Sequence, residues 1–166
     1  RGRPDRRRHV VLEVNVKLVL EYDGSDFHGW QFQPGQRTVQ GVIEERLRQM
    51  LGESVRLIGA GRTDAGVHAL GQVANFHTGS NLSPDVIGRG LNGLLSPDVA
   101  VRSAESVPEA FHARFDARSR CYRYCIATRR RAVGRMYAWF VPYRLNAEAM
   151  QTAAGTFVGR QCFASF

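Results

Sequence analysis

Residues 61–69 read G-R-T-D-A-G-V-H-A, and the runs on either side of this stretch predict the fold around it. Residues 55–58 and 72–76 are short apolar segments bounded by glycines, which is typical of strands. The nine residues therefore predict a loop that joins two neighbouring strands, which is a rigid support for chemistry. Within this loop Arg62 and Asp64 carry opposite charges two residues apart.

An arginine and an aspartate in a glycine-rich loop have two interpretations. They can form an ordinary surface ion pair in a tight turn, with Asp64 capping backbone N–H groups and little effect on stability. Alternatively, Asp64 is a carboxylate presented for chemistry, and the positive charge of Arg62 favours its ionised form. The spacing alone favours the first interpretation.

The literal string favours the second, because residues 61–69 resemble the signature loop of the tRNA pseudouridine synthase A (TruA) family. Further segments resemble motifs of that family in the same order along the chain. They are the opening motif within 21–33, the helix start at 38–40, F-H-A-R-F at 111–115 and Y-R-Y at 122–124. The resemblance runs from about residue 16 to residue 166.

This resemblance implies an isomerase that converts uridine to pseudouridine in the anticodon stem-loop of tRNA, at nucleotides 38–40 of the tRNA, without a cofactor or a metal. Asp64 would be the catalytic residue, acting either as a nucleophile or as a base at the sugar. The target uridine would be flipped out of the base stack, at a cost of roughly a few kcal/mol. The resemblance also implies a homodimer.

The resemblance assigns substrate-binding roles as well. Arg62 would occupy the space that the flipped base leaves, and Tyr122 would stack on the uracil, with removal of the C5 proton as a second role. The segment expected to hold the RNA backbone is Phe111, His112, Ala113, Arg114 and Phe115.

The order of predicted elements indicates an α+β fold. Alternating apolar residues over 11–21 predict a half-buried strand, and helical periodicity predicts helices over 38–51, with Thr38 as N-cap, and from 83 to 95. With a strand at 99–102, the set predicts a mainly antiparallel sheet with helices packed on one face. The resemblance identifies this as the pseudouridine synthase fold, which has two pseudo-repeated halves, the second of them largely missing here.

The expected domain organisation follows this order. Residues 1–10 predict a basic disordered arm, 11–110 a first α/β half with the catalytic loop, and 111–166 central strands and a helix leading into a missing C-terminal half. In this last region the pattern predicts strands at 118–126 and 136–141 and a helix from Asn146 to Gly159. On the first of these strands, arginines and tyrosines would share one face, for RNA contact or for packing in a core.

The charge of the chain indicates a polyanionic partner. The net charge is +8 and 22 of the 23 basic residues are arginine. Guanidinium groups match phosphate oxygens and stack on bases, so tRNA suits this composition, although a basic face that only aids solubility would have the same charge. Eight of the arginines lie within 114–135, with Asp116 as the single acid.

Other functional classes have little support in the sequence. No apolar run is long enough to span a bilayer, so we expect no membrane association. Three cysteines without a Cys-x-x-Cys pair indicate a reducing compartment, taken to be the bacterial cytoplasm, with an organelle as the alternative. The histidines do not group with the cysteines, so we predict no metal site.

Two other functions are alternatives to a pseudouridine synthase. A non-catalytic RNA-binding or assembly domain could keep the same fold, but it would have no need for Asp64, Arg62 and Tyr122 together. A metal-dependent nuclease would need clustered carboxylates, which the sequence lacks.

Overall fold

The computed structural model describes residues 13–164, which form two units, one ending at Arg120 and the other beginning at Cys121. The predicted arm at 1–10 lies outside the described residues. The loop at 61–69, with Arg62 and Asp64, belongs to the first unit, and Tyr122 belongs to the second.

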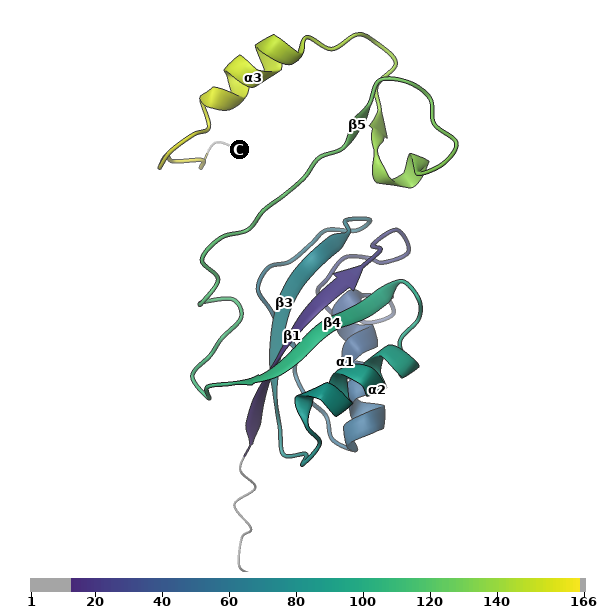
Figure 1. The fold of residues 1–166 in the computed structure, drawn as a ribbon, viewed down its shortest axis with the longest axis vertical. Helices are drawn as coiled ribbons and strands as arrows, with labels where there is room; N and C mark the ends of the chain where they lie inside the picture. The colour runs from purple at the N-terminus through teal and green to yellow at the C-terminus, as the bar shows by residue number, and fades with distance from the viewer. Residues whose placement is uncertain (1–12, 165–166) are drawn as a thin grey trace, which may run out of the picture. The chain divides into compact units, whose positions relative to one another are not determined.

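The described part of the first unit is a four-stranded antiparallel sheet with two helices against one face (Figure 1). Its elements in chain order are β1 (Val14–Tyr22), α1 (Val39–Leu51), β2 (Ile58–Gly59), β3 (Ala69–Thr78), α2 (Pro84–Leu94) and β4 (Val99–Val107). Across the sheet the order is β2-β3-β1-β4, so β1 is hydrogen-bonded on both sides. The predicted α+β class, with an antiparallel sheet and helices packed on one face, is confirmed.

The core lies between this sheet and the two helices. Every second residue of β1 from Val16 to Tyr22 is buried, as the alternating pattern predicted. The two helices contribute side chains at helical spacing, which are Val39, Ile43, Leu47, Ile87 and Leu91. Each such side chain contributes about 1.5–3 kcal/mol by leaving water.

The helix ends follow the predicted signals. The Thr38 hydroxyl accepts a hydrogen bond from the N–H of Gly41 at 3.3 Å, and Gly52 ends α1 in the left-handed region with φ +72°. This end favours glycine because a Cβ makes that region unfavourable. Helix α2 starts at Pro84, whose fixed φ suits the first helical position.

The strand predictions beside the loop are correct in place but wrong in length. Strand β2 is Ile58–Gly59 instead of 55–58, because the N–H of Leu57 donates to the Glu44 carboxylate at 2.8 Å rather than to a strand. Strand β3 is longer than 72–76 and begins at the last residue of the signature stretch. Strand β4 likewise extends beyond 102 to Val107.

The second unit differs more from the prediction. Its described elements are β5 (Ile126–Ala127), the short helix η1 (Arg135–Tyr137), β6 (Trp139–Phe140) and α3 (Ala147–Gly155), with β5 and β6 paired in parallel. The predicted strand at 118–126 is wrong, because residues 118–125 are irregular and have no ladder partner among the residues that the structure describes. Helix α3 begins after Asn146 as predicted but ends four residues before Gly159, where the Thr156 hydroxyl closes the last turn.

An ion pair joins the segment before α1 to the turn before β4. The Arg37 guanidinium donates to both carboxylate oxygens of Asp98, at 2.8 and 3.1 Å, and lies 4.0 Å from the ring centroid of Phe27. The hydrogen bond from Arg37 lowers the pKa of Asp98, and the hydroxyl of Ser96 lowers it further. Their mutual hydrogen bond likewise raises the pKa of Arg37.

The Asp98 carboxylate should make stability depend on pH. Because its pKa is lower in the folded chain, it stabilises the fold above its unfolded pKa of about 3.9, and this contribution is lost as pH falls through the folded value. Asp98→Ala should lower the free energy of unfolding at pH 7 by about 1 kcal/mol, allowing for partial exposure of both groups. Urea unfolding should show that the difference from the unchanged chain shrinks below about pH 4.

Glu45→Gln is the matched control, since Glu45 is exposed and lies 3.8 Å from Arg46. It should change the free energy of unfolding by less than about 0.5 kcal/mol. A loss in Asp98→Ala that is equally large at pH 7 and at low pH would contradict the role of the carboxylate charge.

Candidate active site

The loop between β2 and β3 is fixed at both ends. The N–H of Ala60 donates to the carbonyl of Val73 at 2.8 Å, which continues the β2-β3 pairing into the loop. Further along, the N–H of Val67 donates to the carbonyl of Asp64 at 3.2 Å. Gly66, within that turn, has φ +78°, which a side chain would make unfavourable.

The centre of the loop is held by the opening motif. The hydroxyl groups of Thr63 and Tyr22 lie 2.8 Å apart, and the carbonyl of Thr63 accepts the N–H of Trp30 at 2.9 Å. Both aromatic side chains are 2% exposed, so the two groups that hold Thr63 come from the packed core. The neighbours of Thr63, Arg62 and Asp64, are exposed.

Two glycines of the opening motif allow this close approach. A Cβ at Gly24 would lie 2.0 Å from the carbonyl oxygen of Val67, and one at Gly29 would lie 2.7 Å from that of Thr63. Gly29 also has φ +85°. The motif at 21–33 and the loop at 61–69, separate in sequence, therefore form one structural unit.

Asp64 lies in an open groove of about 360 Å³, within the range of roughly 300–1,000 Å³ that is usual for ligand sites. The groove is lined by His28, Trp30, Gln31, Gln33, Arg62, Thr63, Asp64 and Ala65. Within the described part of the chain, neither Arg62 nor Asp64 forms an ion pair or a side-chain hydrogen bond. The interpretation of these two as a surface ion pair is therefore wrong.

Of the eight lining residues, the sequence predicted only Arg62 and Asp64 as site residues, and three of the six that it missed have polar side chains in the opening motif. His28, Gln31 and Gln33 belong to the opening motif, but nothing in their pattern indicated that they would face Asp64. Their place in the sequence could have identified them, because these polar residues lie on both sides of Trp30 in a loop that contains glycines. Such loops on a rigid scaffold often carry binding residues.

The predicted RNA-binding segment, 111–115, has an anchor of its own on the sheet. Ala113 is buried, and its N–H donates to the side chain of Asn75 on β3 at 2.9 Å. Asn15 on β1 donates to the carbonyl of Phe111 at 2.9 Å and is itself bonded to Asn75. These two buried amides hold the segment, and Ala113 is its only buried residue.

The outer side chains of this segment form a small stacked group. The rings of His112 and Phe115 stack with centroids 4.2 Å apart, and the Arg114 guanidinium lies 5.9 Å from the Phe115 centroid. Phe115 is 76% exposed, which is unusual for a large apolar side chain. None of the five residues lines the groove of Asp64.

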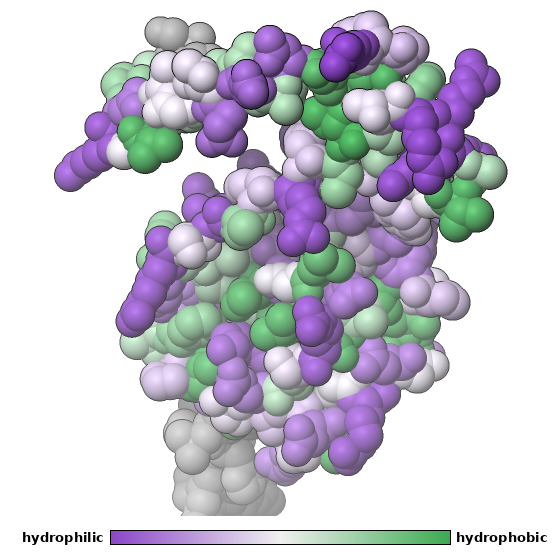
Figure 2. Space-filling model, turned by 45° about the horizontal axis from the view of Figure 1, so that its top comes forward, coloured by the Kyte–Doolittle hydropathy of each residue, from purple (hydrophilic) through white to green (hydrophobic). Residues whose placement is uncertain are grey.

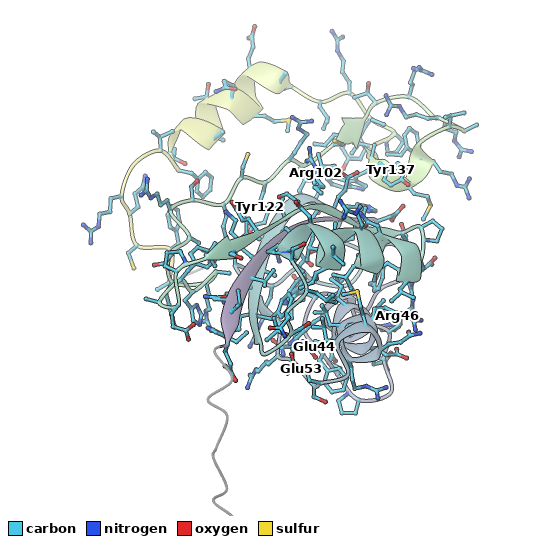
Figure 3. The ribbon with its side chains drawn as sticks, turned by 60° about the horizontal axis from the view of Figure 1, so that its bottom comes forward. Glu44, Arg46, Glu53, Arg102, Tyr122 and Tyr137 are labelled. Atoms are coloured by element: carbon cyan, nitrogen blue, oxygen red, sulfur yellow. The ribbon has the colours of Figure 1, made fainter. Side chains whose placement is uncertain are left out.

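Tyr122 is 73% exposed and lies in the irregular stretch before β5 (Figure 3). All eight arginines of 114–135 are exposed as well. Figure 2 shows hydrophilic side chains, in purple, interspersed with hydrophobic ones on the face that it presents. Exposed arginines and aromatic rings are available to contact phosphate groups and bases.

Residues 13–164 show neither a metal-binding cluster nor a membrane-spanning helix. No three histidine, cysteine, aspartate or glutamate side chains there form a group that could hold a metal ion. No helix in the same stretch combines the length and the apolar character that crossing a membrane requires.

Comparison with known proteins extends the resemblance beyond single motifs. The family described as tRNA pseudouridine synthase matches residues 18–116. The chain is 51% identical over 154 residues to tRNA pseudouridine synthase A of Geotalea daltonii, covering 92% of this chain and 63% of the relative. The corresponding proteins of Caldicellulosiruptor bescii and of a Thermoanaerobacter species are 46% and 43% identical, with the same coverage. The chain thus spans about 63% of the length of these relatives, and it belongs to the tRNA pseudouridine synthase family.

Proposed function

We propose that the protein isomerises uridine to pseudouridine in the anticodon stem-loop of tRNA, with Asp64 as the catalytic residue. The observation that carries this proposal is the position of Asp64. Its carboxylate is exposed in an open groove of about 360 Å³, and it extends from a loop whose centre is held by the buried side chain of Tyr22. A fixed acidic group beside an open groove can act on a bound substrate without prior rearrangement.

The reaction requires no net gain or loss of atoms. The bond between N1 of uracil and C1′ of ribose breaks, the base turns, C5 bonds to C1′, and the C5 proton moves to N1, directly or through solvent. An accessible carboxylate suits attack on C1′ and also suits removal of a proton from the sugar. Neither step needs a redox cofactor.

Access to the base requires that the nucleotide leave its helix. A stacked uridine cannot enter the groove, so the target is flipped out, as in other enzymes that act on a base. Arg62, which lines the groove, fills the vacated space, and Tyr122 stacks on the uracil. The segment 111–115 and the arginines of 114–135 hold the RNA backbone. From the family resemblance we also propose a homodimer, and from the cysteine pattern a location in the cytoplasm.

Asp64→Asn tests the catalytic assignment. The amide cannot act as nucleophile or base, so tritium release from C5-labelled uridine in tRNA should fall at least roughly a thousandfold. Binding of tRNA and the free energy of unfolding should change little, since Asp64 makes no side-chain bond within the described part of the chain. Asp85→Asn, at an exposed position on α2, is the control. Retained turnover in Asp64→Asn would remove Asp64 from the mechanism.

Arg62→Ala tests the flipping step. Loss of the side chain that fills the vacated space should lower kcat by about 10- to 100-fold, while the free energy of unfolding stays within about 0.5 kcal/mol. A fluorescent base analogue placed next to the target uridine should report slower flipping. Arg89→Ala, also at an exposed position, is the control. A variant that unfolds would indicate a structural role for Arg62 instead.

Tyr122→Phe and Tyr122→Ala separate stacking from chemistry at the hydroxyl group. If the ring stacks on the flipped uracil, phenylalanine should retain most of the turnover. Alanine should lose about 5- to 150-fold, because base stacking on an aromatic ring is worth roughly 1–3 kcal/mol. Tyr124→Phe and Tyr124→Ala are the matched controls, since Tyr124 is also exposed. A large loss of turnover in Tyr122→Phe would show that the hydroxyl takes part in the reaction.

A further inference from the structure

A chain of hydrogen bonds behind the groove begins at Leu57 and fixes the orientation of Gln40. The N–H of Leu57 donates to Oε1 of Glu44 at 2.8 Å, and Nε2 of Gln40 donates to the same oxygen at 2.9 Å. Nε2 of Gln40 also donates to the carbonyl of Leu57 at 3.2 Å. Gln40 is buried, with 6% of its surface exposed. Because a carbonyl can only accept a hydrogen bond, the amide nitrogen of Gln40 must face Leu57.

The other end of the Gln40 amide determines the orientation of Gln31. Oε1 of Gln40 accepts the backbone N–H of Phe32 at 2.8 Å, and a backbone N–H can only donate. The same oxygen lies 3.1 Å from Gln31, so the Gln31 atom that faces it must be the amide nitrogen Nε2. Oε1 of Gln31 then has no hydrogen-bond partner among residues 13–164, and Gln31 lines the groove beside Asp64.

We propose that Gln31 binds the nucleotide in this groove, with its carboxamide oxygen accepting a hydrogen bond from uridine. This inference rests on the proposed function and adds a substrate-binding residue to it. Uridine offers two donors of suitable chemistry, the ribose 2′-hydroxyl and the N3–H of uracil. The hydrogen-bond chain holds the acceptor in place before the substrate arrives, which reduces the entropy lost on binding.

Its orientation also makes Gln31 selective. A carboxamide that could rotate would offer either a donor or an acceptor to the ligand. Turning the Gln31 amide over would place its oxygen against that of Gln40, leaving two acceptors facing each other in a partly buried place. The groove therefore presents the Gln31 oxygen as an acceptor of constant position, and it complements a donor on the nucleotide.

The test measures binding in the full chain carrying Asp64→Asn, so that the substrate is not consumed. Fluorescence anisotropy gives Kd for three anticodon stem-loop RNAs, whose target nucleotide is uridine, 2′-deoxyuridine or 3-methyluridine. Gln31→Leu keeps the size of the side chain and removes its polar atoms. Gln36→Leu is the control, because Gln36 is exposed in the same segment but does not line the groove.

Gln31→Leu should weaken binding of the uridine RNA about three- to tenfold, as expected for one hydrogen bond, and Gln36→Leu should not. The RNA that lacks the donor bonded to the Gln31 oxygen should bind the chain with Gln31 and the chain with Gln31→Leu with equal affinity. Equality with 2′-deoxyuridine identifies the ribose hydroxyl, and equality with 3-methyluridine identifies the uracil N3–H.

Two results would overturn the assignment of Gln31 alone. One is unchanged binding of the uridine RNA by Gln31→Leu, and the other is an equal loss of affinity for all three RNAs. Thermal unfolding of each variant checks that the loss of affinity does not come from misfolding. The Kd values of the three RNAs are also compared for the chain with native Gln31, and this comparison involves no substitution at that position. Failure of the chain with native Asp64 to bind or convert the uridine RNA would instead overturn the proposed function, and the Gln31 assignment with it.

Discussion

The close approach of two backbone segments is the constraint on which the site depends. Residue 24 has no room for a Cβ against the carbonyl of Val67, and Gly29 lies almost as close to Thr63. Because glycine occupies both positions, the opening motif can reach the loop that carries Asp64 and hold Thr63 through Tyr22 and through the backbone of the motif. The exposed position of Asp64 is therefore set by its neighbours, and among residues 13–164 it has no ion pair.

Buried polar side chains, rather than the apolar core alone, connect this loop to the rest of the fold. Gln40 extends from α1 and bonds groups on two separate loops, and every polar atom of its amide has a partner. Asn15 and Asn75 act in the same way on the sheet, where they hold the segment that begins at Phe111. A buried amide that is fully bonded specifies one arrangement, because every alternative leaves a polar atom unsatisfied.

Local patterns predicted much of the first unit. Period-two alternation identified β1, and Thr38 and Gly52 marked both ends of α1, because caps act through bonds to near neighbours. The same reasoning was wrong at 118–126, where arginine and tyrosine alternate as they would in a strand. A strand also needs a partner for its ladder, and residues 118–125 have none in the described part of the chain. Near β2, the Glu44 carboxylate accepts the backbone N–H of Leu57, a residue that the pattern had assigned to a strand.

The family, the α+β class and the choice of Asp64 and Arg62 as candidate site residues could be read from the amino-acid sequence, since they rest on motifs whose members lie close together in the chain. Three features became visible in the folded chain alone. They are that Arg62 and Asp64 do not pair, that the opening motif lines the groove together with the loop, and which way the Gln31 amide faces. Each of these features depends on contacts between segments that are far apart in sequence. Such contacts arise when the helices pack on the sheet and bring the loops together, and no local pattern encodes them.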